Sequence, residues 1–146
     1  MTKIKFSKTQ LNQFKKMGIE TIYLFGSRVQ DHIHPLSDFD FGVVFSNPKK
    51  YKEKTLDIYF KLYEIFTEVL PKKYLRQRFK LRKHEFDIVF LQFAPISLQF
   101  SAIRNGKVLY ERDKEKRLRY EENIIKRNAD LKYFYDLSFK ALLERI

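Results

Sequence analysis

The sequence predicts an α/β (α+β) fold, in which a small mixed sheet is flanked by helices and followed by a long C-terminal helix. Short stretches rich in β-branched and aromatic residues alternate with stretches in which apolar residues recur every three or four positions, as is typical of a sheet covered by helices. Glycine or proline separates most of these stretches and marks the turns. The chain has 146 residues, which is about the length of one domain, so we expect a single domain over residues 1–146.

The first helix and the first strand have clear sequence boundaries. Ser7 is a typical N-cap residue for a helix over residues 8–17, and Gly18 is a typical residue to end that helix. Residues 19–25 (IETIYLF) are β-branched and aromatic, which predicts a strand that stops at Gly26.

The middle of the chain is predicted to contain a second strand and a long helix. Residues 27–33 are expected to form a short helix or turn before a proline breaks the chain, and residues 38–45 (DFDFGVVF) are expected to form the strand. Residues 51–70 are predicted to form the helix because apolar side chains recur on one face. That face is expected to consist of Leu56, Tyr59, Tyr63, Phe66 and Leu70.

The last part of the chain is predicted to add two strands and two helices. Residues 84–91 (HEFDIVFL) form a third strand, residues 95–104 a helix, and residues 107–110 a short fourth strand. From residue 112 onward one long terminal helix is expected. Its buried stripe is expected to consist of Leu118, Ile125, Leu131, Phe134 and Leu142.

Composition narrows the class of protein. The absence of cysteine excludes disulfides, cysteine metal sites and a thiol nucleophile. No apolar run reaches the roughly 18 residues of a membrane span, and the N-terminus lacks an apolar signal core, so we expect a cytoplasmic protein without membrane contact. The net charge of +12 attracts polyanions. Weak nucleic-acid binding is therefore kept as a side activity, although the charge also serves solubility.

A Gly-Ser pair is separated by ten intervening residues from an Asp-x-Asp motif. Gly26 and Ser27 follow a predicted strand, where glycine lets the backbone approach phosphate oxygens and N–H groups at a helix start favour anions. Arg28, directly after them, is a further candidate phosphate contact, and a solvated arginine is an equal alternative. An isolated Gly-Ser pair would indicate only a turn at the end of a strand, so the functional interpretation depends on the acids that follow.

Three acids are candidate metal ligands. Asp38 and Asp40 lie two residues apart on a predicted strand and therefore project from the same face. Two adjacent carboxylates repel each other, and hard cations such as Mg²⁺ prefer oxygen ligands. Asp87 lies between Phe86 and Ile88 in an apolar strand, where a carboxylate is costly unless it is paired or binds metal. If these strands are neighbours, the three acids can hold two metal ions about 4 Å apart.

This pattern resembles the DNA-polymerase-β-type nucleotidyltransferase superfamily. The downstream segments Pro-Ile-Ser-Leu and Ile-Arg-Asn-Gly-Lys-Val-Leu-Tyr-Glu resemble, more specifically, the minimal nucleotidyltransferase (MNT) antitoxins, which are encoded beside HEPN-domain RNase toxins. The resemblance covers residues 19–136 and implies a nucleotidyltransferase-like fold. It further implies that ATP is the nucleotide donor and that two Mg²⁺ ions assist the reaction.

The resemblance assigns a role to each residue of the pattern. Gly26 and Ser27 hold the triphosphate of ATP, whereas Asp38 and Asp40 bind both Mg²⁺ ions. Asp87 ligates the catalytic metal and helps to deprotonate the acceptor hydroxyl.

The acceptor that the resemblance implies is a tyrosine of a cognate HEPN-domain toxin, which is AMPylated and silenced within a hetero-oligomer. Two alternatives stay open: a non-catalytic antitoxin that acts by stoichiometric binding, and a nucleotidyltransferase that acts on a small molecule. A basic segment over residues 72–83 (KKYLRQRFKLRK) either borders the active-site cleft or is a solvated hairpin or helix.

Overall fold

The structure is a computed structural model that describes residues 4–26, 39–70 and 86–145. Its elements, in chain order, are α1 (Lys8–Lys16), β1 (Ile19–Phe25), β2 (Phe39–Phe45), α2 (Pro48–Tyr51), α3 (Thr55–Val69), β3 (Phe86–Phe90), the 3₁₀ turn η2 (Leu91–Phe93), α5 (Ile96–Asn105), β4 (Lys107–Glu111) and α6 (Lys114–Glu144). The strands and the terminal helix therefore form within a residue or two of the positions predicted from the sequence.

The described strands form one mixed sheet in the order β3-β2-β1-β4. β1 pairs antiparallel with both β2 and β4, whereas β2 pairs parallel with β3. All seven residues of β1 are buried, as expected for a central strand that is covered on both faces. The predicted fold, a small mixed sheet with flanking helices and a long C-terminal helix, is confirmed.

Helices cover the two faces of the sheet unequally. The larger core lies between the sheet and helices α1 and α3, and it includes Phe14 of α1, Phe41 of β2 and Phe66 of α3. The Phe41 and Phe66 rings stack with centroids 3.9 Å apart. A smaller core lies on the other face, where Ala102 of α5 packs with buried residues of the sheet and Tyr120 of α6 packs against them.

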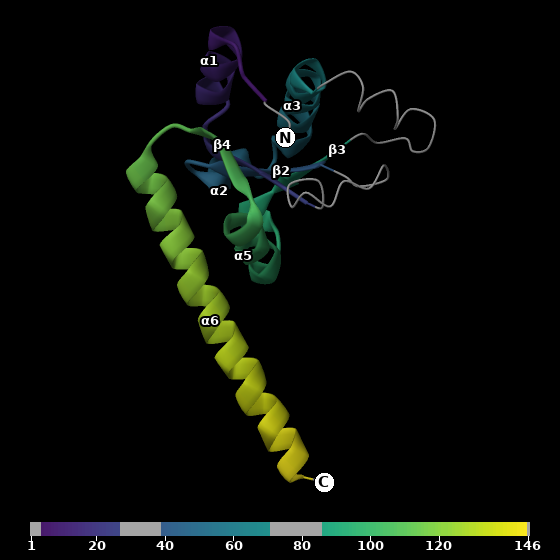
Figure 1. Ribbon diagram of the computed structural model, residues 1–146, viewed down its shortest axis with the longest axis vertical. Helices are drawn as coiled ribbons and strands as arrows, with labels where there is room; N and C mark the ends of the chain where they lie inside the picture. Colours follow the sequence, from purple (N-terminus) through teal and green to yellow (C-terminus); the bar gives the residue numbers. More distant parts are fainter. Residues whose placement is uncertain (1–3, 27–38, 71–85, 146) are drawn as a thin grey trace, which may run out of the picture.

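The first turns of α6 are fastened to the sheet by a polar network. The Tyr23 hydroxyl of β1 donates a hydrogen bond to Glu121 Oε2 at 2.7 Å. Arg117 Nη1 donates to the same oxygen at 2.6 Å, and Arg117 Nε also pairs with Glu111 of β4. Beyond these turns, α6 extends away from the sheet (Figure 1).

The predicted buried stripe of α6 is wrong. Leu118, Ile125, Phe134 and Leu142 of the expected α6 stripe are exposed, and the buried residue is Ile124. Only the base of this helix lies on the sheet, so apolar periodicity further out does not correspond to burial within this chain.

On α3 and its C-cap the predicted face is right except at Leu56, which is exposed: Phe66 and Leu70 are buried, and Tyr59 and Tyr63 pack partly buried against the same core. The buried face also includes Ile58, Leu62 and Ile65. The predicted helix over residues 51–70 is also divided into α2 and α3. The Tyr51 ring stacks on Phe45 with centroids 5.1 Å apart, which ties α2 to the end of β2 before α3 begins.

None of the helices in the described ranges is long and apolar enough to cross a membrane. The expected cytoplasmic location stays a prediction.

Candidate active site

The predicted site residues that the structure describes come together at one end of the sheet. Gly26 follows directly after β1, and Phe25 pairs with Asp40 of the antiparallel strand β2. β3 begins at the same end because it runs parallel to β2, and its Asp87 pairs with Asp40. Three segments that are far apart in the sequence thus bring a glycine and two acids to adjacent positions.

Asp40 and Asp87 project from the same face of the sheet. Their neighbours Phe41 and Ile88 belong to the core against α1 and α3, and side chains alternate between the faces of a strand. Both carboxylates therefore point toward the side that α5 covers. Neighbouring strands lie about 4.8 Å apart, so the two acids are side by side. Asp40 is half-buried and Asp87 is exposed, which leaves the pair accessible to a ligand.

Gly26 has a backbone conformation that suits its predicted role. Its φ is +105°, in a region that residues with a side chain rarely adopt. The chain therefore turns sharply at the end of β1 and presents bare backbone beside the acids. Such a turn allows a close approach of phosphate oxygens.

The donor set fits a hard divalent cation. Two carboxylates on adjacent strands offer oxygen ligands with concentrated negative charge, which is what Mg²⁺ prefers. Within the described residues, no three histidine or acidic side chains gather at one point. The third predicted ligand, Asp38, lies outside the described residues, as do Ser27, Arg28 and the basic segment 72–83.

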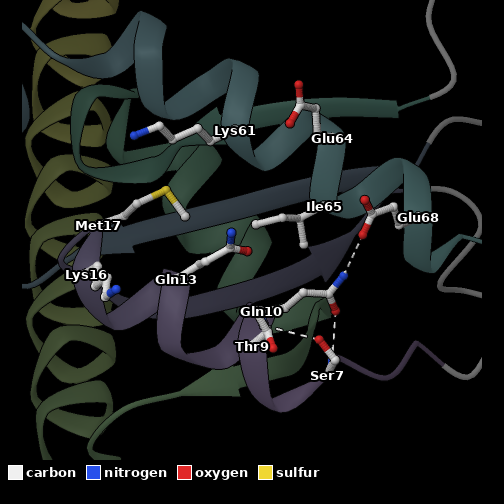
Figure 2. Close-up of a pocket in the computed structure, with 10 residues that line it drawn as sticks. All are labelled: Ser7, Thr9, Gln10, Gln13, Lys16, Met17, Lys61, Glu64, Ile65 and Glu68. Carbon is white, nitrogen blue, oxygen red and sulfur yellow. Dashed lines mark hydrogen bonds between the residues drawn. The ribbon is translucent and has the colours of Figure 1, made fainter.

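A polar groove between α1 and α3 is distinct from this site (Figure 2). It has a volume of ≈ 730 Å³, and Gln10 Nε2 bridges the two helices by donating to Glu68 Oε2 at 3.0 Å. Because α1 and α3 cover the face opposite to Asp40 and Asp87, the groove does not open onto the acids. Lys16 and Lys61 together with Glu64 and Glu68 give it a mixed charge.

Sequence reasoning missed a side chain that holds the opposite end of the sheet, away from the acids, in place. Gln92 in η2 accepts a hydrogen bond from Phe45 N at 2.7 Å and donates to Phe45 O at 2.9 Å, which fixes the exit of β3 to the end of β2. A lone glutamine in an apolar stretch carries no sequence signal for this role.

The sequence matches the family described as "Polymerase beta, Nucleotidyltransferase" over residues 8–115. The chain belongs to this nucleotidyltransferase family. The matched range contains β1, β2 and β3, and hence Gly26, Asp40 and Asp87.

Relatives of this nucleotidyltransferase include a protein adenylyltransferase, MntA, of Aphanizomenon flos-aquae (strain 2012/KM1/D3). It is 28% identical over 114 residues, which are 78% of this chain and 71% of the relative.

Two solved structures show the same fold. The first is a toxin–antitoxin complex with AMP-PNP, with a TM-score of 0.58, 18% identity, and coverage of 92% of this chain and 94% of the other. The second is a complex of a tri-AMPylated Shewanella oneidensis HEPN toxin with an MNT antitoxin, with a TM-score of 0.50, 16% identity, and coverage of 93% and 98%.

Proposed function

We propose that this nucleotidyltransferase is an antitoxin that transfers AMP from ATP to a tyrosine hydroxyl of a cognate HEPN-family RNase toxin and thereby neutralises it. The observation that carries the proposal is the pairing of Asp40 with Asp87 beside the turn at Gly26. The relative named as a protein adenylyltransferase and the fold shared with toxin–antitoxin complexes support the choice of acceptor.

The proposed roles are those that the family resemblance assigns to these sequence positions. Gly26 and Ser27, with Arg28 beside them, bind the triphosphate and orient its α-phosphorus toward the acids. Asp38, Asp40 and Asp87 hold two Mg²⁺ ions, which when bound neutralise the charge of the phosphates and of the leaving group. Catalysis is therefore mainly a matter of position and charge.

The transfer conserves atoms and charge. The tyrosine oxygen of the acceptor forms a bond to the α-phosphorus, while the bond between that phosphorus and the oxygen bridging to the β-phosphorus breaks. Pyrophosphate leaves with the electron pair. Asp87, which is exposed at the start of β3, takes up the hydroxyl proton.

A transfer assay with α-labelled ATP, Mg²⁺ and the purified cognate toxin tests the proposal. Asp40→Asn and Asp87→Asn should each lower labelling of the toxin by about 100-fold or more, because loss of a metal ligand removes several kcal/mol of charge stabilisation. Asp57→Asn, which changes an exposed acid on α3, is the matched control and should label normally. Chelation of Mg²⁺ by EDTA should stop transfer in all samples.

The same assay separates the alternatives. A protein that binds and inhibits the toxin without ATP, and leaves it unlabelled, acts by stoichiometric occlusion. The exposed apolar side chains on the outer part of α6 favour tight binding, so this is the second candidate. Label on a small hydroxyl compound instead of the toxin would identify a small-molecule nucleotidyltransferase.

A further inference from the structure

β3 lies at the edge of the sheet. Among the described residues it pairs with β2 on one side and with no strand on the other. An edge strand presents a row of unpaired N–H and C=O groups, which is a template for another extended chain. Peptide recognition by strand addition uses this geometry, with side-chain pockets beside the edge providing selectivity.

An apolar trough runs along this edge. Its volume is ≈ 640 Å³, and its lining consists of Ile88, Val89 and Phe90 of β3 with Lys52, Thr55, Phe93 and Ala94. Phe93 is 45% exposed, although it is a large aromatic residue directly after the strand. The trough thus offers apolar contacts to alternate side chains of a chain that pairs with β3.

The side of α3 next to β3 is also apolar. Leu56 is 65% exposed and Phe60 is 60% exposed. They precede Tyr63 by seven and three residues, so all three lie on one side of the helix. Tyr63 packs against Phe86 of β3 with ring centroids 4.9 Å apart, which shows that this side faces β3. Exposed apolar residues that gather beside a strand edge mark an interaction surface.

The positive charge around the trough indicates which kind of partner segment would fit it. Lys52 lines it, and Lys49, Lys50 and Lys54 lie within three residues of Lys52, against the single acid Glu53. A segment that fits must therefore combine apolar side chains with acidic ones.

The trough is continuous with the candidate active site. Asp87 is the second residue of β3, and the trough begins at the next residue, Ile88. A chain that pairs with β3 therefore passes directly beside the catalytic acid. We propose that the β3 edge is the acceptor-docking site, where an extended, apolar and acidic segment of the protein acceptor adds to the sheet and brings its tyrosine hydroxyl to Asp87.

This proposal rests on the proposed function and deepens it. Strand addition recognises polypeptide backbone, so it explains how one small domain selects a protein acceptor over a small hydroxyl compound. It also predicts that the acceptor tyrosine lies in a segment that is extended when bound.

Two variants of the whole protein test the site. Phe60→Asp and Phe93→Asp each place a negative charge on an exposed position of this surface. Each should raise the KM for the toxin about tenfold or more, while leaving the affinity for ATP unchanged. Val108→Asp on β4, the opposite edge strand, is the matched control, because Val108 is also exposed (39%) and should tolerate the change.

Backbone pairing is tested with a synthetic tyrosine peptide that alternates apolar and acidic residues. AMP transfer to this peptide should be lost when the backbone amides along the edge that pairs with β3 are N-methylated. N-methylation of the amides along its other edge should have little effect. Hydrogen exchange of the Ile88–Phe90 amides should slow when the unmethylated peptide binds.

The outcomes distinguish the two proposals. If the wild type labels neither toxin nor peptide, the proposed function fails. If the wild type labels the toxin and both Phe60→Asp and Phe93→Asp label it with an unchanged KM, the proposed docking site is wrong. The proposed function would still stand. Pairing of β3 with β3 of a second copy, seen as a dimer by light scattering that both variants dissociate, would also overturn the docking site.

Discussion

Gly26 shows how one backbone angle connects the fold to the proposed chemistry. Glycines with positive φ flank β1 at both ends, with φ +71° at Gly18 and φ +105° at Gly26. Only the second adjoins the acids, because Phe25 pairs with Asp40 whereas the other end of β1 pairs with Phe45. Substitutions at the two glycines can therefore distinguish a loss of stability through backbone strain from a loss of ATP binding.

Gly26→Ala is expected to lower both stability and nucleotide use. An alanine at this φ costs of order 1–3 kcal/mol, and relief of that strain moves the turn away from the triphosphate. The KM for ATP should rise, and the free energy of unfolding in urea should fall.

Gly18→Ala is the control for this prediction. It should also lower the free energy of unfolding, because a Cβ there would lie 2.2 Å from Tyr51 Oη, but it should leave the KM for ATP unchanged. An unchanged KM in Gly26→Ala, measured on the folded variant, would remove this glycine from the nucleotide site.

The attachment of α6 to the sheet depends on a buried tyrosine. Burial first, and then the hydrogen bond to Glu121, raise the pKa of Tyr23 above its usual value of about 10. The folded protein therefore keeps this proton at a pH where the unfolded chain has lost it. The stabilising contribution is complete below about pH 10 and is lost as the pH rises further.

The free energy of unfolding should consequently fall above pH 10, by about 1.4 kcal/mol per pH unit for this tyrosine. Tyr23→Phe should be less stable at pH 8, because it loses the hydrogen bond, and should show a shallower decline between pH 10 and 11. Urea titrations at each pH measure both effects. The exposed Tyr133 is the control position, and an equal slope in Tyr23→Phe and wild type would contradict the assignment.

The strands could be predicted from the sequence more accurately than the helix faces. β1 forms over the predicted residues because IETIYLF is β-branched and aromatic and ends at a glycine. The predicted α6 stripe was wrong because periodicity shows which side of a helix is apolar, and not what covers it. Ile124 and Ile125 are adjacent in sequence, yet Ile124 is buried and Ile125 is 51% exposed.

The candidate site could also be predicted only in part, because a local pattern gives the face on which a side chain lies but not the segment that lies beside it. Alternation along β2 and β3 places Asp40 and Asp87 on the face opposite to Phe41 and Ile88, and this follows from the sequence once the strands are known. The parallel register that sets Asp40 opposite Asp87 depends on contacts between segments far apart in the chain. The place of β3 at the edge of the described sheet likewise depends on strand order, which no local pattern specifies.

At the scale of the whole molecule, the candidate catalytic acids and a large exposed apolar surface lie in different places. The acids lie at one end of the sheet, whereas the outer part of α6 extends into solvent (Figure 1). We define the distal surface as the exposed large apolar residues on this part of α6, namely Tyr133, Phe134, Tyr135, Leu137, Phe139, Leu142 and Leu143. A surface this apolar is typical of a protein interface, and we expect it to hold the body of the toxin while the β3 edge takes the acceptor segment.

Replacing Phe134 and Phe139 with Ser should therefore weaken toxin binding by at least 2 kcal/mol, or roughly 30-fold in Kd, because buried aromatic residues dominate interface energies. The affinity for ATP should be unchanged, because both residues are exposed on the outer part of α6. Leu118→Ser, an exposed apolar position at the base of α6, is the matched control. Calorimetric titration of the toxin measures Kd. A different outcome would contradict this prediction: the wild-type protein self-associates, and the Phe134→Ser/Phe139→Ser variant is monomeric but binds the toxin with unchanged affinity. The distal surface would then be a contact between two copies of this chain.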